Sequence, residues 1–277
     1  MKKAKFYIGT IPAIIWGEPS ERIFIHVHGK MSRKEYAESF AAIVQEYGYN
    51  TLSFDLAQHG ERNDDRRCDV WSGMADLKQI YDYVNGKWKN ISLHACSIGA
   101  YFALNAYKDI VFDKCLFQSP IVDMEWLVKH MMMWSGVTEK ELFEKQEIQT
   151  DIDVLCWDYY RYILSHPIEK WNSPTAILYG GKDNLQPLSA VKTFADKFGA
   201  ILTVSENSEH PFKPSADKPQ RVLFIYFPFH ALSSRLPVRL SYSRSLSLYQ
   251  RNGCSTPHVR RLSPLPFRPD GRLCLLS

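Results

Sequence analysis

Short apolar segments alternate with longer amphipathic ones along the first 210 residues. The apolar segments are rich in β-branched and aromatic residues and are bounded by Gly, Pro, Ser or Asn, so they predict β-strands. They are KFYIGTIPAIIWG, whose central break indicates a hairpin, and RIFIHVHG, NTLSFDLA, NISLHACS, DKCLFQSP, TAILYGG and AILTVSE. The amphipathic segments predict helices over residues 33–48, 71–86, 98–108 and 188–199.

Strands separated by helices of this length favour a parallel sheet covered on both faces. We therefore predict one α/β core over residues 1–212, built on a doubly wound, mostly parallel sheet. A chain of 277 residues has room for one such domain with a substantial core. The connection over residues 124–173 is longer than the others and rich in helix formers, methionine and aromatic residues, so we predict a helical lid insertion over the strand ends.

Two stretches of the insertion, MEWLVKHMMMW and CWDYYRYI, combine aromatic residues with methionine or other apolar residues. Side chains of this kind line apolar pockets for acyl or aromatic groups. The same stripes also pack helices against one another. The sequence leaves both interpretations open.

The charge balance changes abruptly near residue 212. Residues 1–212 hold 23 Lys and Arg against 28 Asp and Glu, a net charge of −5, whereas residues 213–277 hold 11 against 2, a net charge of +9. The second segment also contains 8 of the 15 prolines and ten serines, and only RVLFIY indicates a strand in it. We interpret it as a basic Pro/Ser/Arg-rich tail outside the fold, of the kind that an out-of-frame or alternative coding end produces. Binding of nucleic acid through this tail is the less favoured interpretation.

Six cysteines are scattered along the chain without a CxxC pair, so we predict free thiols and a reducing, cytoplasmic compartment. The N-terminal segment imitates a secretory signal, but Thr10 and Pro12 interrupt its apolar run and no small-residue cleavage site follows. No stretch reaches the roughly 18 apolar residues of a membrane-spanning helix, so we expect no membrane association. The oligomeric state is left open.

One serine, Ser97, lies between a predicted strand and a predicted helix in ISLHACSIGAYFAL, with Ala95 and Gly99 two positions away on either side. A sharp strand-to-helix turn holds its central residue in a strained conformation, and bulky neighbours would collide with the adjoining strand and helix. Such a turn lifts the hydroxyl clear of the sheet, near unpaired helix N–H groups that favour developing negative charge. Ser97 is therefore a candidate nucleophile.

A serine nucleophile needs a histidine as base and a carboxylate that orients the histidine. Asp183 follows one predicted strand, in GGKDNLQP, and His210 follows the next, in SENSEHPF. Both lie just past the C-terminal end of their strand, where an open parallel sheet gathers its functional loops. We therefore predict that Ser97, Asp183 and His210 converge.

These motifs resemble those of the α/β-hydrolase family, and the resemblance covers residues 4–212. The matching features are ACSIG at the nucleophile, GKDNLQP at the acid, SEHPF at the histidine, HVHGK after one strand and FDLAQHGER after the next, with the order Ser, acid, His preserved. The resemblance implies that Ser97 is the nucleophile, His210 the general base and then acid, and Asp183 the orienting carboxylate.

The resemblance also implies an oxyanion hole formed by the backbone N–H groups of Lys30, just after His28 and Gly29, and of Ile98. Fixed donors of this kind are worth about 3 kcal/mol each in acyl-transfer enzymes. Because only the main chain is used, we expect the Lys30 side chain to be unconstrained. Two features depart from the family: Ala95 replaces the first glycine of GxSxG, and the Pro-rich tail stands where the family continues into a helix.

Other residues offer alternatives for these roles. Cys96 carries a thiol, but the neighbour of the turn residue is expected to point back into the core. Among the alternative acids, we expect Asp55 to hydrogen-bond within its own loop and the insertion residues Asp153 and Asp158 to be solvated.

Four histidines raise the question of a metal, yet no carboxylate or cysteine falls at ligand spacing, so we predict neither metal nor cofactor. They are His26, His28, His59 and His94.

The sequence thus predicts a serine hydrolase that cleaves a small carboxylic ester or thioester through an acyl-enzyme on Ser97, with a small-molecule ester or acyl compound as its partner. Peptidase and lipase activities are less supported. The alternative from another class is a non-catalytic α/β-hydrolase-like binding protein, or an inactive product whose displaced C-terminus fails to position His210.

Overall fold

The computed structural model describes residues 1–210 and residue 212. Within this range, eight strands form one sheet in the order β1-β2-β4-β3-β5-β6-β9-β10. The hairpin β1–β2 is antiparallel and joins β4 in antiparallel pairing, whereas the remaining pairs are parallel. The strands are β1 Lys3–Ile8, β2 Ile11–Trp16, β3 Arg22–Val27, β4 Asn50–Phe54, β5 Asn90–Cys96, β6 Cys115–Gln118, β9 Thr175–Gly180 and β10 Ile201–Ser205.

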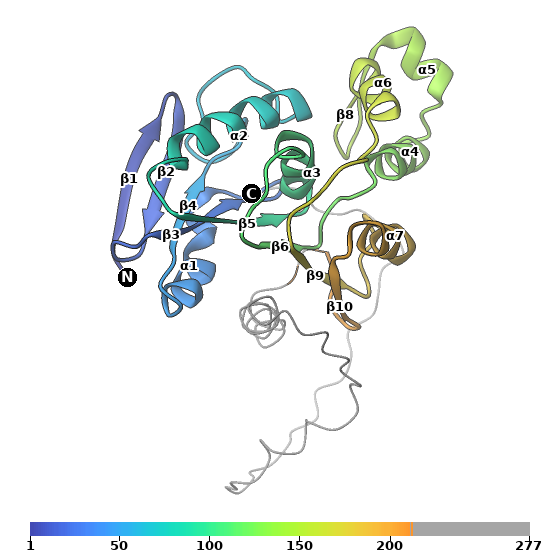
Figure 1. Ribbon diagram of the computed structural model, residues 1–277. Helices are drawn as coiled ribbons and strands as arrows, with labels where there is room; N and C mark the ends of the chain where they lie inside the picture. The colour runs from blue at the N-terminus through green and yellow to red at the C-terminus, as the bar shows by residue number, and fades with distance from the viewer. Residues whose placement is uncertain (211, 213–277) are drawn as a thin grey trace, which may run out of the picture. The chain divides into compact units, whose positions relative to one another are not determined.

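Helices lie on both faces of this sheet, with α2 and α3 on one face and α1 on the other (Figure 1). The predicted helix over residues 33–48 is a 3₁₀ turn, η1, followed directly by the shorter α1. The other predicted helices form within one or two residues of the expected bounds. The elements are η1 Lys34–Ala37, α1 Glu38–Gln45, α2 Val70–Val84, α3 Ile98–Ala106 and α7 Leu188–Phe198.

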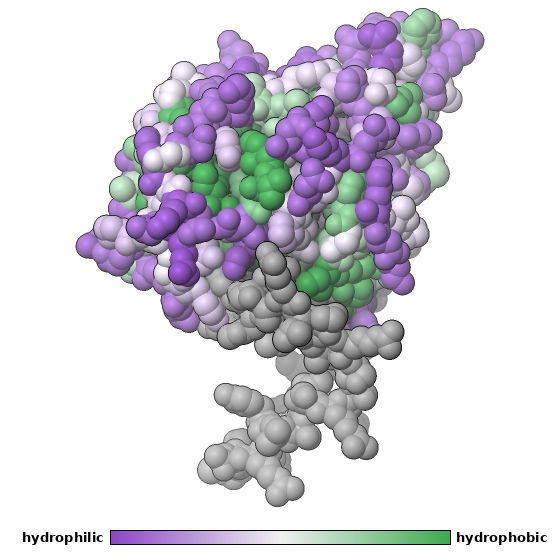
Figure 2. Space-filling view, viewed as in Figure 1, coloured by the Kyte–Doolittle hydropathy of each residue, from purple (hydrophilic) through white to green (hydrophobic). Residues whose placement is uncertain are grey.

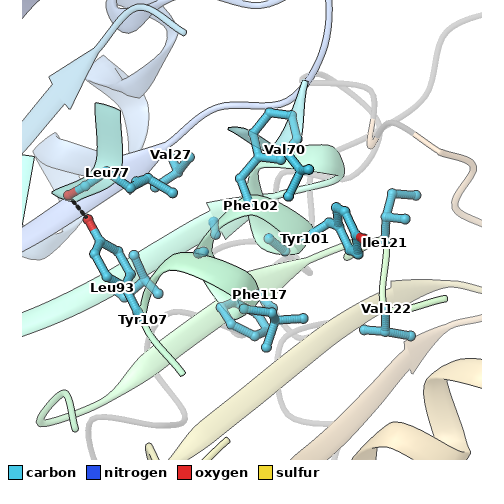
Figure 3. Close-up of a cluster of buried hydrophobic side chains, with 14 of the residues drawn as sticks. Val27, Val70, Leu77, Leu93, Tyr101, Phe102, Tyr107, Phe117, Ile121 and Val122 are labelled. Carbon is cyan, nitrogen blue, oxygen red and sulfur yellow. Dashed lines mark hydrogen bonds between the residues drawn. The ribbon is translucent and has the colours of Figure 1, made fainter. Parts of the chain in front are cut away.

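Alternate residues of the central strands are buried on opposite faces, because successive side chains of a strand point to opposite sides. In β3, Ile25 belongs to the larger apolar cluster, which includes residues of α2, α3 and α7, whereas Phe24 packs with Phe40 of α1. Figure 3 shows part of the larger cluster, where the buried Tyr107 hydroxyl donates a 2.7 Å hydrogen bond to the Leu77 carbonyl of α2. Burial on both faces confirms the doubly wound sheet.

The segment 124–173 connects β6 to β9 and contains more than the predicted helices, because two three-residue strands form a hairpin within it. In Figure 1 its helices stand beyond one end of the sheet. Its elements are α4 Met124–Trp134, α5 Glu139–Lys145, β7 Glu147–Gln149, β8 Val154–Cys156 and α6 Trp157–Ser165.

Apolar residues of the insertion pack into the same cluster as the sheet. The aromatic and methionine-rich stretches of the insertion therefore pack secondary-structure elements together, which is one of the two interpretations that the sequence left open. On the face seen in Figure 2 the insertion is mainly hydrophilic, with apolar residues exposed singly. Its action as a lid remains a prediction. The buried residues are Met124, Leu127, Val128, Met132, Leu142, Leu155, Tyr160 and Ile163.

Phe212 is buried against the cluster on the α1 face, with Phe24 and Leu178. The predicted tail over residues 213–277, with its RVLFIY strand, lies outside the described residues, so the domain boundary stays a prediction. In the part of the chain that the structure describes, none of the helices has both the length and the apolar character needed to span a membrane.

Candidate active site

Ser97 lies at the turn between β5 and α3 with a backbone φ of 50°, a conformation that is strained for a residue with a side chain. The end of β6 and the loop after it hold the turn: the Ser97 N–H donates to the Gln118 carbonyl at 3.1 Å, and the Ser97 carbonyl accepts from the Ile121 N–H at 3.1 Å. Gly99 is required here, because a Cβ at this position would clash with the His28 carbonyl oxygen. Ala95 is fully buried.

The three side chains predicted to converge are hydrogen-bonded in series. Ser97 Oγ lies 2.9 Å from His210 Nε2, and His210 Nδ1 lies 2.7 Å from Asp183 Oδ2. The other carboxylate oxygen accepts from the N–H groups of Leu185 and Gln186 at 2.8 and 3.2 Å. With Nδ1–H donated to the carboxylate, His210 presents a bare Nε2 to the serine hydroxyl, which is the tautomer that a general base requires.

The segment that carries His210 is tied to the end of β9 by main-chain contacts. The Lys182 N–H donates to the Ser208 carbonyl at 2.9 Å, and the Gly181 N–H donates to the Ser205 carbonyl at 2.8 Å. Gly180 permits this close approach, because a Cβ there would lie 2.7 Å from the Ser208 carbonyl oxygen. These contacts hold the segment of His210 against the loop that carries Asp183.

The loop after β3 brings its main chain against the serine. A Cβ on Gly29 would lie 3.1 Å from Ser97 Cβ. Among the described residues, the N–H groups of Lys30 and Ile98 donate no hydrogen bond to the protein. Main-chain donors are normally paired, so two unpaired N–H groups on the segments flanking a serine hydroxyl are of the type that an oxyanion hole needs.

The Lys30 side chain is constrained, contrary to the prediction. Its ammonium group pairs with Asp153, in the turn between β7 and β8. Asp153 is therefore not merely solvated, whereas Asp158 is exposed and pairs only with the exposed Arg161 of its own helix. The contact was missed because Lys30 and Asp153 are 123 positions apart, and only the fold of the insertion brings them together.

Asp55 has the loop-fixing role that we predicted and a second role as well. Its carboxylate accepts from the Glu61 N–H at 2.9 Å within its own loop. It also accepts from the Lys34 N–H at 2.8 Å and pairs with the buried Lys34 ammonium at 2.7 Å. The loops after β3 and β4 are thereby joined.

Cys96 is half-buried and is not among the residues of the apolar clusters, so its predicted place in the core is not confirmed. Strand alternation places it on the same face as His94, at the strand end beyond the apolar cluster. Ser97, not Cys96, supplies the atom that is hydrogen-bonded to His210 Nε2, so the serine remains the better candidate nucleophile.

The four histidines that raised the question of a metal are engaged in other contacts. The Nδ1 atoms of His26 and His94 lie 2.8 Å apart, and His28 and His59 hydrogen-bond to loop main chain. Burial lowers the pKa of His28 to about 4. Among residues 1–210 and 212, no group of three or more His, Cys, Asp or Glu is arranged to hold a metal ion.

Comparisons with known proteins identify the architecture. No protein-family model matches the chain, and no curated protein sequence matches it. Among solved structures, Est1E from Butyrivibrio proteoclasticus with ferulic acid bound has a TM-score of 0.68 at 16% identity, covering 83% of this chain and 100% of that one. Alpha/beta hydrolase domain-containing protein 10 from mouse has a TM-score of 0.66 at 16% identity, covering 83% and 98%. The Pyrococcus furiosus esterase Pf2001 has a TM-score of 0.60 at 17% identity, covering 82% and 89%.

This chain has the α/β-hydrolase fold. The resemblance inferred from its motifs is confirmed at the level of the fold. At identities of 16–17% the comparisons establish the fold.

One residue that shapes this candidate site was missed in the sequence. Gln186 is fully buried, and its Oε1 accepts from the N–H groups of Val122 and Asp123 at 3.0 and 2.8 Å. Its Nε2 donates to the Asp123 carbonyl at 2.9 Å. Gln186 thus joins the loop of Asp183 to the start of the insertion. Its place in GKDNLQP was a signal, but the motif does not indicate the partners of a glutamine.

Proposed function

We propose that the protein is a serine hydrolase that cleaves a small carboxylic ester or thioester through an acyl-enzyme on Ser97. The observation that carries the proposal is the hydrogen-bonded series Ser97, His210 and Asp183, in which the Ser97 turn lies beside two main-chain N–H groups that bond to no other described residue. The similar structures named as esterases agree with this class. Est1E holds ferulic acid, a carboxylic acid, and ester hydrolysis releases a carboxylic acid.

In the first half of the reaction, Ser97 Oγ attacks the substrate carbonyl carbon while His210 Nε2 takes its proton. The N–H groups of Lys30 and Ile98 stabilise the negative charge that develops on the carbonyl oxygen. Asp183 keeps the imidazole in position and stabilises its positive charge. His210 then protonates the departing alcohol or thiol, and the acyl group remains on Ser97.

In the second half, water gives a proton to His210 Nε2 and attacks the acyl carbon. The second tetrahedral intermediate collapses, Ser97 Oγ takes back the proton from His210, and the carboxylic acid leaves. Every proton and bond is accounted for by these side chains and water, so the proposed reaction needs no cofactor.

The test is to label the protein with a fluorophosphonate probe, locate the adduct by mass spectrometry and measure hydrolysis of p-nitrophenyl acetate. Ser97→Ala is expected to abolish labelling and to lower kcat by at least about 10⁴-fold, because the nucleophile and its base act as one unit.

Ser119→Ala is a matched control. Ser119 also has a positive φ, 42°, and follows the neighbouring strand β6, but its buried hydroxyl has no hydrogen-bond partner among residues 1–210 and 212. This variant is expected to label and turn over like the parent. Labelling of Ser97→Ala as strong as that of the parent would place the nucleophile elsewhere. A folded parent that neither labels nor hydrolyses short-chain esters or thioesters would instead favour the binding protein.

A further inference from the structure

A histidine ring fixes the peptide group that contains the Lys30 N–H. His28 Nδ1 lies 2.7 Å from the Gly29 carbonyl oxygen, and His28 Nε2 accepts from the Leu56 N–H at 3.0 Å. Because His28 Nε2 accepts a hydrogen bond, this nitrogen is unprotonated. The ring proton is therefore on Nδ1, which donates it to the Gly29 carbonyl. The Gly29 carbonyl and the Lys30 N–H belong to one planar trans peptide group and point in opposite directions. Holding the carbonyl therefore sets the direction of the N–H.

A second histidine fixes the next peptide group in the reciprocal manner. His59, on the loop after β4, has its Nδ1 2.7 Å from the Ala57 carbonyl oxygen, and its Nε2 accepts from the Met31 N–H at 3.0 Å. The same argument assigns the Nδ1–H tautomer to His59. Each loop thus supplies one ring that accepts a hydrogen bond from the main chain of the other. Lys30 lies between the two peptide groups held in this way.

The backbone at Met31 needs such a restraint. Its φ of 59° lies in the left-handed region, which costs about 1 kcal/mol for a residue with a side chain. The Met31 side chain is 73% exposed, so packing contributes little to holding this conformation. The hydrogen bond from the Met31 N–H to His59 is the polar contact that spans the two loops at this point.

We propose that His59 is a positioning residue for the oxyanion hole, which holds the Lys30–Met31 peptide group so that the Lys30 N–H faces the carbonyl oxygen of the substrate. This inference rests on the proposed function of Ser97. His59 has no part in the proton transfers. It acts through the main chain of Lys30, and its loss changes the stabilisation of the transition state rather than substrate binding.

The experiment compares the full-length parent with His59→Ala and His59→Gln. A glutamine places an acceptor oxygen near the position of Nε2, so it can still accept from the Met31 N–H. In His59→Ala, kcat for p-nitrophenyl acetate is expected to fall about 10- to 100-fold, because one donor is misplaced rather than deleted. KM is expected to change less than about twofold, since the defect lies in the transition state. His59→Gln is expected to stay within about threefold of the parent kcat.

Amide hydrogen exchange at Met31 is the readout that does not depend on activity. The exchange rate is expected to rise at least about tenfold in His59→Ala and to stay near the parent rate in His59→Gln. Gln58→Ala is the matched control on the same loop, because the Gln58 side chain accepts from the Cys68 N–H at 2.9 Å, whereas the Met31 N–H is bonded to His59. Both its exchange and its kcat are expected to match the parent.

The two proposals fail in different ways. A parent that neither labels at Ser97 nor turns over overturns the proposed function without any variant. An active parent whose His59→Ala variant loses exchange protection at Met31 but keeps kcat within about twofold overturns the positioning role alone. Equal losses of kcat in His59→Ala and His59→Gln, with Met31 still protected in the latter, also overturn it.

Discussion

The loops on the two sides of Ser97 are held by different means. On the side of the proposed base, His210, the loops after β9 and β10 contact each other through main-chain hydrogen bonds that Gly180 makes sterically feasible. On the side of the proposed oxyanion donors, the loops after β3 and β4 are joined by side chains, namely two imidazoles and the buried Lys34–Asp55 pair. The contact between the loops after β9 and β10 requires room for the backbone at Gly180. The contact between the loops after β3 and β4 requires the correct protonation states of the two histidines and of the Lys34–Asp55 pair.

The largest effect is expected on the side of the base. In Gly180→Ala, the new methyl group meets the carbonyl oxygens of Ser208 and Glu209, so the segment that carries His210 has to move. We expect the free energy of unfolding to fall by about 1–3 kcal/mol. Because a displacement of about 1 Å in an active site can cost about 100-fold, kcat is expected to fall at least about tenfold. Urea unfolding and steady-state hydrolysis measure the two effects.

Gly136→Ala is the control for this comparison. Gly136 has a φ of 66° and open space around it, so alanine there costs about 1 kcal/mol of backbone strain and leaves the active site in place. Hydrolysis is expected to be unchanged. If both variants lose activity in proportion to stability, the β9–β10 contact has no special role in holding His210.

The next effect is expected on the side of the oxyanion donors and depends on pH. Burial lowers the pKa of His28 in the folded protein from 6.5 to about 4, so the unfolded chain binds the proton more tightly. Stability is therefore full above pH 6.5 and is lost as the pH falls toward 4. We expect this group to remove about 2 kcal/mol from the free energy of unfolding between pH 7 and pH 5.

His28→Gln removes this titration and is expected to make unfolding less dependent on pH, although the variant is less stable at pH 7. Urea unfolding at pH 7 and pH 5 gives the difference for parent and variant. An identical pH dependence in the two proteins would mean that His28 does not carry the effect.

The smallest effect is expected where the insertion contacts the oxyanion loop. The Lys30–Asp153 pair has side chains that are 42% and 38% exposed, and exposed pairs are worth less than about 1 kcal/mol. Asp153→Asn is expected to change kcat less than about threefold, with the difference shrinking as salt is added. Asp151→Asn, on the same turn, is the control. A loss of more than about tenfold in kcat for Asp153→Asn alone would mean that the insertion controls the oxyanion loop.

The strands of the large sheet were all predicted from the sequence, because each combines β-branched or aromatic residues with a turn signal at its end. The hairpin of β7 and β8 was not, since three-residue strands carry too little pattern to separate them from the helix-rich segment around them. The helix over residues 33–48 was predicted as one element, whereas its first turn is 3₁₀. The amphipathic period marks a buried face but does not distinguish the two helix types.

The sequence by itself determined which side chains meet at the site, because the C-terminal ends of parallel strands lie at one edge of the sheet, and the three residues follow β5, β9 and β10. Ser97 and His210, 113 positions apart, could be paired for this reason. Only the tertiary structure decided how the oxyanion loop is held. The contacts of Lys30 with Asp153 and of Met31 with His59 follow no spacing rule, because they depend on the approach of two loops and on the tautomer of a ring, neither of which leaves a periodic signal in the chain.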